Sequence, residues 1–197
     1  MKKIKLITLL LAVAAFLPAL CLAQSGADLP TFGRGILACG TAPVNGTSEV
    51  QTITIGGTPT GGTFKLIFRG KSTAAISWSN NNAQLNTNVE VALRALGEIG
   101  GTNATVATGT MTAGIGTMTC TFSGNVGKLD VPQMTATNAM TGTSPTVAVS
   151  TTTPGITADG RNATTGQLLI DKTAGKLYIN TSSTSQSPTW IVVGNQS

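Results

Sequence analysis

Residues 50–69 read VQTITIGGTPTGGTFKLIFR, and this stretch decides the class of fold that the sequence predicts. Apolar and polar side chains alternate over 50–55, which is typical of a β-strand with one buried face. The alternation resumes over 63–69, whereas glycine, threonine and proline fill the segment 56–62. That composition is typical of a turn. We therefore predict two strands joined by a turn.

A third strand is predicted directly downstream. Gly70-Lys71 makes a tight connection to residues 72–79, where Ile76 and Trp78 share one face. Strands joined by short glycine-containing turns pair in an antiparallel meander. On this reading Trp78 belongs to the core.

A helix interrupts the β pattern at about residues 83–97. Its apolar residues recur at spacings of three and four and make one stripe: Leu85, Val89, Ala92, Leu93 and Leu96. The preceding Asn80-Asn81-Asn82 offers side chains that can cap the first free amides. The stripe predicts a helix that covers one side of a sheet.

Threonine- and valine-rich strands follow the helix. We predict four of them, separated by Gly, Asn and Pro, at residues 102–108, 116–122, 131–137 and 146–152. Residues 49–153 thus form one β-rich module with one helix. The predicted fold class is mainly β (α+β), an antiparallel sheet or sandwich with one packed amphipathic helix.

A second β unit is predicted at the C-terminus. A linker at residues 154–165 leads to residues 166–197, where three short strands make a small sheet. Such a sheet is marginal by itself, so we expect it to pack on the first unit or on copies of itself. Tyr178 and Trp190 lie in this sheet, where a place in its core or in a contact between subunits is favoured over ligand binding, and they are its possible interaction surface.

The first 23 residues resemble a secretory leader. Lys2, Lys3 and Lys5 precede an apolar run, and small residues at Cys21 and Ala23 mark a cut after Ala23. A retained membrane anchor or a lipidated Cys21 is the alternative. Without this leader, nine basic and seven acidic side chains remain, so the formal charge of +5 falls to +2. The basic balance therefore does not predict a nucleic-acid partner.

The segment after the leader, residues 24–48, has no sustained periodicity and predicts a flexible N-terminal arm. Within it, residues 36–39 could form a short strand. Export into an oxidising compartment would allow Cys39 and Cys120 to pair in a disulfide. Two buried free thiols are the alternative.

Composition excludes several kinds of catalytic site. The chain has no histidine, so it cannot form a Ser-His-Asp triad, a Cys-His pair or a His-ligated metal site. Three cysteines cannot make a four-thiolate zinc site. The acidic residues are scattered without a spacing suited to acid–base catalysis. We therefore predict no catalytic residue, no metal, no cofactor and no enzyme activity.

Two stretches resemble known virus and surface modules. The first comprises GGTFKLIFRG (61–70), AISWSN (75–80), ALRALGEIG (92–100) and TSPTVAVSTTTPG (143–155). It resembles a β-rich repeat module of tailed-phage virion structural proteins and of large secreted bacterial surface proteins. The second, GQLLIDKTAGKLYIN (166–180), is similar to a short hairpin motif of phage tail-fibre and head-surface proteins.

The resemblance implies a non-enzymatic structural or attachment protein. We expect a virion-type surface, decoration or fibre-associated component, and the alternative is a secreted bacterial cell-surface or matrix protein that binds cells or glycans. The expected partners are copies of itself or other virion or surface proteins. The expected location is extracellular or on a particle surface, with membrane contact only through the leader.

Overall fold

The computed structural model describes residues 37–39, 41–184 and 186–194. Its elements, in chain order, are β1 (Leu37–Cys39), β2 (Val50–Phe68), β3 (Lys71–Ser72), β4 (Ile76–Ser77), α1 (Asn82–Arg94), β5 (Ala104–Thr112), β6 (Ile115–Phe122), the 3₁₀ helix η1 (Gly124–Val126), β7 (Thr135–Thr153), β8 (Leu168–Asp171), β9 (Lys176–Asn180) and β10 (Trp190–Val192). The predicted class is confirmed, because the described chain is mostly β with one packed helix and antiparallel pairing prevails.

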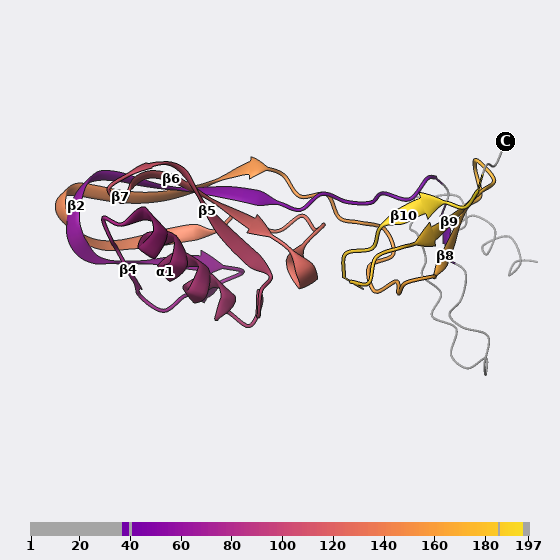
Figure 1. The fold of residues 1–197 in the computed structure, drawn as a ribbon, viewed down its shortest axis with the longest axis horizontal. Coiled ribbons are helices and arrows are strands. Elements are labelled where there is room, and N and C mark those ends of the chain that lie inside the picture. The colour runs from indigo at the N-terminus through magenta and orange to yellow at the C-terminus, as the bar shows by residue number, and fades with distance from the viewer. Residues whose placement is uncertain (1–36, 40, 185, 195–197) are drawn as a thin grey trace, which may run out of the picture.

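The fold is built on one long antiparallel ribbon of β2 and β7, each 19 residues long. The two strands pair from Val50↔Thr153 to Ile67↔Thr135. The sequence prediction of a turn at residues 56–62 is therefore wrong, as is the division of β7 into two strands. Figure 1 shows the reason: the paired ribbon bends as a unit at its far end, so that its two halves run in separate layers.

Bulges produce this bend. The β2–β7 register shifts between Gly56 and Thr58 and again between Pro59 and Gly61. Gly57 has φ of +72° and Gly142 has φ of +129°, conformations that favour glycine. A Cβ at Gly57 would lie 2.1 Å from the carbonyl oxygen of Ser144, so no side chain fits there. The glycines that resemble a hairpin turn thus serve as bulges in a continuous ladder.

Shorter strands extend both halves of the ribbon. The first half of β2 pairs with β6, which pairs with β5, and the second half pairs with β3 and β4. The predicted tight connection is present one residue earlier than expected: Arg69 and Gly70 form the turn, both with positive φ as a two-residue hairpin turn requires, and Lys71 already belongs to β3.

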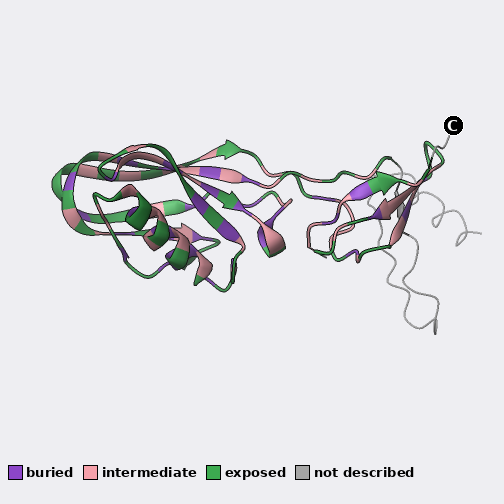
Figure 2. Cartoon of the chain, in the orientation of Figure 1, coloured by how far each residue is buried: buried purple, intermediate pink, exposed green. Residues whose placement is uncertain are grey.

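Helix α1 packs against the sheet with the predicted stripe. The Asn81 side chain accepts a hydrogen bond from the backbone N–H of Gln84, which confirms a cap within the asparagine run. Leu85, Val89 and Leu93 are fully buried. Figure 2 shows buried and exposed positions alternating along the long strands, as expected for strands with one face on this core. The stacked rings of Phe68 and Phe122, with centroids 5.3 Å apart, belong to the same cluster.

The C-terminal strands form a second, four-stranded sheet in the order β1-β8-β9-β10. The three predicted strands are present, and β1 adds a fourth by pairing in parallel with β8. The short strand that the sequence allowed within the arm is therefore present at residues 37–39, where the arm is not flexible. The prediction of a flexible arm is wrong at Thr47, which forms a β-bridge with Ile156. Residues 24–36 and the predicted leader at residues 1–23 lie outside the described residues.

Candidate functional site: the C-terminal sheet and its joint

The inner face of the C-terminal sheet carries a small apolar core. Leu169 and Trp190 are buried with Ala163, and Tyr178 packs against them partly exposed. The Trp190 indole N–H donates to the carbonyl oxygen of Asp159 at 2.9 Å. Trp190 is only 3% exposed, so the core place favoured from the sequence holds for it and the possible interaction surface does not include it. It is a core residue, and Tyr178 lies at the edge of the same core.

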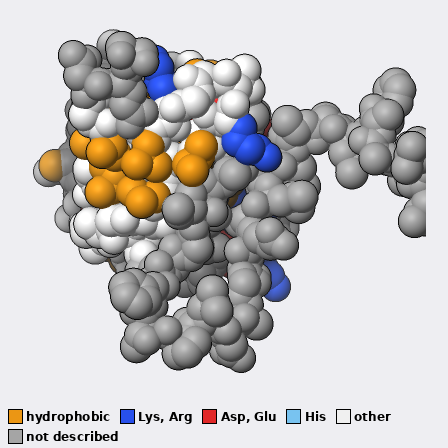
Figure 3. All heavy atoms as spheres, turned by 90° about the vertical axis from the view of Figure 1, so that its right-hand side faces the viewer, with side chains coloured by type: hydrophobic (Ala, Val, Ile, Leu, Met, Phe, Trp, Pro, Cys, Tyr) orange, Lys and Arg blue, Asp and Glu red, His pale blue; other side chains and the backbone are white. Residues whose placement is uncertain are grey.

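The outer face of this sheet is also apolar. In the antiparallel register Leu168 is opposite Ile179, which is opposite Ile191, and Ile170 is opposite Leu177. Val193 lies beside Leu177, because the Val193 N–H donates to the Leu177 carbonyl oxygen. We call these six residues the outer aliphatic face. Ile191 is 49% exposed, and Figure 3, which views this end of the molecule, shows apolar side chains gathered in one patch.

This face escaped the sequence analysis although the sequence carries a signal for it. Leu168-Leu169-Ile170 is a continuous apolar run, and such runs are typical of strands that are covered on both faces. The interpretation of the C-terminal sheet relied on its aromatic residues, which face the other way.

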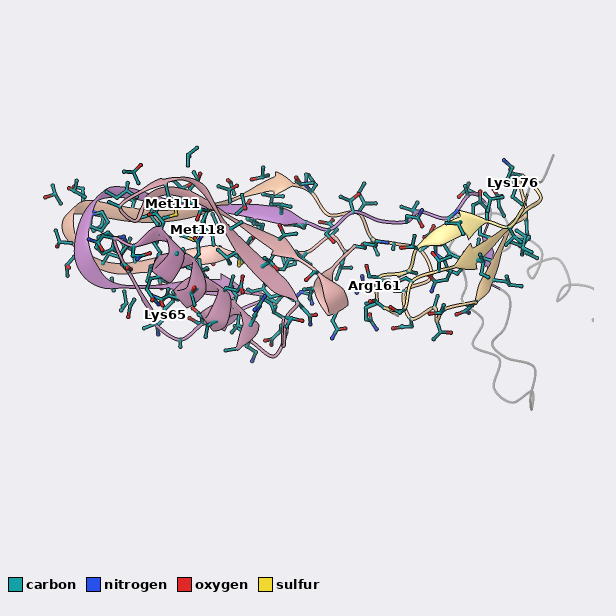
Figure 4. The ribbon with its side chains drawn as sticks, viewed as in Figure 1. Lys65, Met111, Met118, Arg161 and Lys176 are labelled. Atoms are coloured by element: carbon teal, nitrogen blue, oxygen red, sulfur yellow. The ribbon has the colours of Figure 1, made fainter. Side chains whose placement is uncertain are left out.

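Arg161 forms the joint between the ribbon part and the C-terminal sheet. One guanidinium nitrogen donates to the carbonyl oxygens of Gly127 at 2.8 Å and Lys128 at 3.1 Å, and another donates to that of Asn125 at 2.7 Å. Asn125 lies in the short helix η1, and Gly127 and Lys128 directly follow it, so Arg161 binds the backbone acceptors at the end of this helix. Figure 4 shows Arg161 between the two parts of the molecule.

Lys128 reaches across the joint in the opposite direction. Its Nζ donates to the Pro188 carbonyl oxygen at 2.8 Å and to the Thr189 hydroxyl at 2.7 Å. Partial burial lowers the pKa of Lys128, and burial followed by the charge of Arg69 lowers the pKa of Arg161. Each cation thus holds neutral acceptors, and their positions fix the two parts to each other.

Asn45 and Asp159 complete the joint. The Asn45 side chain both donates to the Trp190 carbonyl oxygen at 3.2 Å and accepts from its N–H, so it caps the outer edge of β10. The Asp159 carboxylate accepts from the Val44 N–H at 2.8 Å. Sequence analysis missed all of these residues, because isolated polar side chains in irregular segments carry no periodic signal.

The described acidic side chains mostly bind backbone amides. Glu49 is 1% exposed and accepts from the Val131 N–H at 2.9 Å. Glu90 accepts from the Val106 N–H and forms an ion pair of 2.7 Å with Arg94. Asp171 accepts from two amides of the β8–β9 turn. Within the described residues, no group of three His, Cys, Asp or Glu side chains could hold a metal ion.

The possible disulfide between Cys39 and Cys120 is not present. Cys120 is a free thiol, fully buried in the core of the ribbon part, whereas Cys39 belongs to β1 of the other sheet. Burial raises the pKa of Cys120 to about 12, with a smaller contribution from Glu90. The alternative of a buried free thiol therefore holds for Cys120.

Among the helices that the structure describes, none has the length and apolarity to cross a bilayer. The leader cut after Ala23, and the alternative of a lipidated Cys21, concern residues outside the described part of the chain.

These features define a mainly β protein in which a bent, helix-covered ribbon is joined by polar side chains to a small sheet. No family model and no curated protein matches the chain. Among solved structures, a protein of Mycobacterium phage Patience is similar with a TM-score of 0.37 and 16% identity, over 77% of this chain and 57% of that one. The chain thus spans little more than half of that protein's length, and a likeness this weak does not establish a shared fold.

Proposed function

We propose that this protein is a non-enzymatic structural component of a phage-type particle surface, as a decoration or fibre-associated part. The observation that carries the proposal is the joint. Arg161 and Lys128 together donate to neutral acceptors on both sides of it, which favours one fixed arrangement of the ribbon part and the C-terminal sheet. A fixed shape suits a component that presents one surface while it attaches through another.

The acidic side chains support a structural role. Glu49, Glu90, Asp159 and Asp171 each accept hydrogen bonds from backbone amides, so their carboxylates serve the fold. The resemblance of residues 61–155 and 166–180 to virion modules supports the same reading. The partners would be copies of this chain or other particle proteins, and no cofactor is needed.

The leader-like residues 1–23 favour a second candidate, a secreted bacterial cell-surface or matrix protein that binds cells or glycans. This location would be reached by export and cleavage after Ala23. The two candidates differ in where the mature chain is found.

Fractionation of the native producer on a density gradient tests the choice. The proposal expects the chain to sediment with particles, at a fixed ratio to the other particle proteins. The proposal would be overturned in favour of the secreted candidate if the chain is recovered only on cells or in particle-free medium. Its intact mass would then match a chain that starts at Gln24. If the protein has an enzymatic activity that is lost when Asp130 or Glu98 is replaced, both candidates are contradicted.

A further inference from the structure

Asn45 and Gly46 lie side by side in the joint and form the only Asn-Gly pair of the sequence. They belong to the stretch that connects β1 to β2 between the two parts of the molecule (Figure 1). Asn45 is exposed, so water reaches it. Glycine has no side chain to hinder attack of its backbone nitrogen on the amide carbon of a preceding asparagine. An Asn-Gly pair is therefore prone to spontaneous deamidation.

The fold requires the glycine of this pair. Gly46 has φ of +70°, a conformation that residues with a side chain adopt only with strain. A Cβ there would lie 2.6 Å from the Ile156 carbonyl oxygen and 2.7 Å from the Ala158 nitrogen, so no side chain fits. The close approach lets the two neighbouring segments meet in their β-bridge. The contact that builds the joint thus also places a labile dipeptide in it.

The fold also uses both ends of the Asn45 side-chain amide. Its Nδ2 donates to the Trp190 carbonyl oxygen at 3.2 Å, and its Oδ1 accepts from the Trp190 N–H. Only an amide can do both, because a carboxylate has no hydrogen to donate. While the two hydrogen bonds hold, the side chain is not free to turn toward the Gly46 nitrogen. The closed joint therefore slows the reaction.

We propose that Asn45 is a deamidation site, at which an opening of the joint becomes permanent. The Gly46 nitrogen gives its proton to water and attacks Cγ of Asn45, and the Cγ–Nδ2 bond breaks to release ammonia. Water then opens the cyclic imide at either carbonyl and leaves an aspartate or an isoaspartate. Overall, the amide and one water become a carboxylate and an ammonium ion.

The product cannot close the joint in the same way. Its carboxylate places an oxygen against the Trp190 carbonyl oxygen, where Nδ2 donates in the unmodified chain. The Asp159 carboxylate, which binds the adjacent Val44 N–H, adds a second negative charge nearby. Deamidation therefore removes the cap from β10 and loosens the joint. This inference goes beyond the proposed function, because it concerns the chemistry of the chain wherever the chain is found.

Peptide mapping by mass spectrometry tests the inference on the full chain, held at mildly alkaline pH with and without urea. The mass gain of deamidation should appear at Asn45, at least about tenfold faster in urea than in the folded chain, because opening must precede the reaction. Asn45→Asp, made directly, should lower the urea midpoint and broaden the distribution of shapes in small-angle X-ray scattering. Asn80→Asp is the matched control, since Asn80 is exposed and lies outside the joint, and should do neither.

Three outcomes would overturn the inference. The first is an Asn45 that stays unmodified in urea. The second is an equal rate of deamidation in the folded and the unfolded chain, which would show that the joint does not hold the side chain. The third is an Asn45→Asp variant with the midpoint and scattering profile of Asn80→Asp. The two rates are measured on the unsubstituted chain, so they decide the matter even if Asn45→Asp does not fold.

Discussion

Glu49 offers the sharpest test of the fold, because a buried carboxylate there holds three segments together. It is 1% exposed and accepts from the Val131 N–H at 2.9 Å, the Gln51 amide at 2.6 Å and the Thr151 hydroxyl at 3.3 Å. Gln51 in turn accepts from the Met134 N–H at 2.8 Å and donates to the Pro132 carbonyl. This network ties the irregular segment 131–134 to the start of β2.

Glu49→Ala removes the acceptor and leaves its donors in a buried site. The hydrogen bond to the Val131 N–H is charge-assisted and buried, and its loss costs about 1.5–3 kcal/mol. In this variant the Gln51 amide still donates to the Pro132 carbonyl oxygen, and the hydroxyl of the half-buried Thr151 can donate to water instead. The loss of these two hydrogen bonds to Glu49 therefore adds only about 1–2 kcal/mol. We expect the free energy of unfolding to fall by about 3–5 kcal/mol. Glu49→Gln keeps the volume but sets an NH₂ group against a donor, and should cost about 1–3 kcal/mol.

Urea unfolding followed by far-UV circular dichroism measures these losses, with the midpoint and slope fitted separately. Asp130→Ala is the matched control, since Asp130 is exposed and should change stability by no more than about 0.5 kcal/mol. A loss for Glu49→Ala below about 1 kcal/mol would refute the reasoning. It would mean that the buried amide of Val131 finds another acceptor at no cost.

Three further predictions follow from the bulges, the thiol and the joint. Gly57→Ala should destabilise the protein by several kcal/mol in the same urea assay, because its Cβ would meet the Ser144 carbonyl oxygen at 2.1 Å. The control is Gly97→Ala, which should be close to neutral because there is open space around Gly97. Equal effects of the two substitutions would contradict the role of the bulge. Cys120 should resist thiol reagents at pH 8 until urea unfolds the chain, and rapid labelling of the folded chain would count against this. The free energy of unfolding should decline as pH rises above about 9, because the thiol ionises there in the unfolded chain but only near 12 in the folded one. Arg161→Ala should broaden the distribution of shapes measured by small-angle X-ray scattering. Arg161→Lys should narrow that distribution only partly, because an ammonium group cannot donate to several carbonyls at once as a guanidinium does. An unchanged scattering profile would show that the joint does not depend on Arg161.

Local patterns alone were sufficient to predict the fold class, the helix and most strands. The stripe from Leu85 to Leu96 predicts α1, and the alternation in residues 50–55 and 63–69 identifies both halves of β2. These elements are visible in the sequence because the period of side chains along a helix or strand is a property of neighbouring residues. The same holds for the C-terminal strands and for the absence of histidine chemistry.

Only the tertiary structure decided how these pieces connect and which surfaces they leave. Gly56-Gly57 has the composition of a strand end, but pairing of Gly56 with Thr146 of β7, 90 residues away, makes it part of a bulge. The sequence leaves open whether Trp190 lies in a core or on a surface, and only the folded chain brings Leu169 and the Asp159 carbonyl oxygen against its indole ring. Arg161 and Lys128 acquire their acceptors only when η1 and β10 come together. Long-range pairing depends on residues distant in the chain, which is why local sequence could not reveal the ribbon, the joint or the outer aliphatic face.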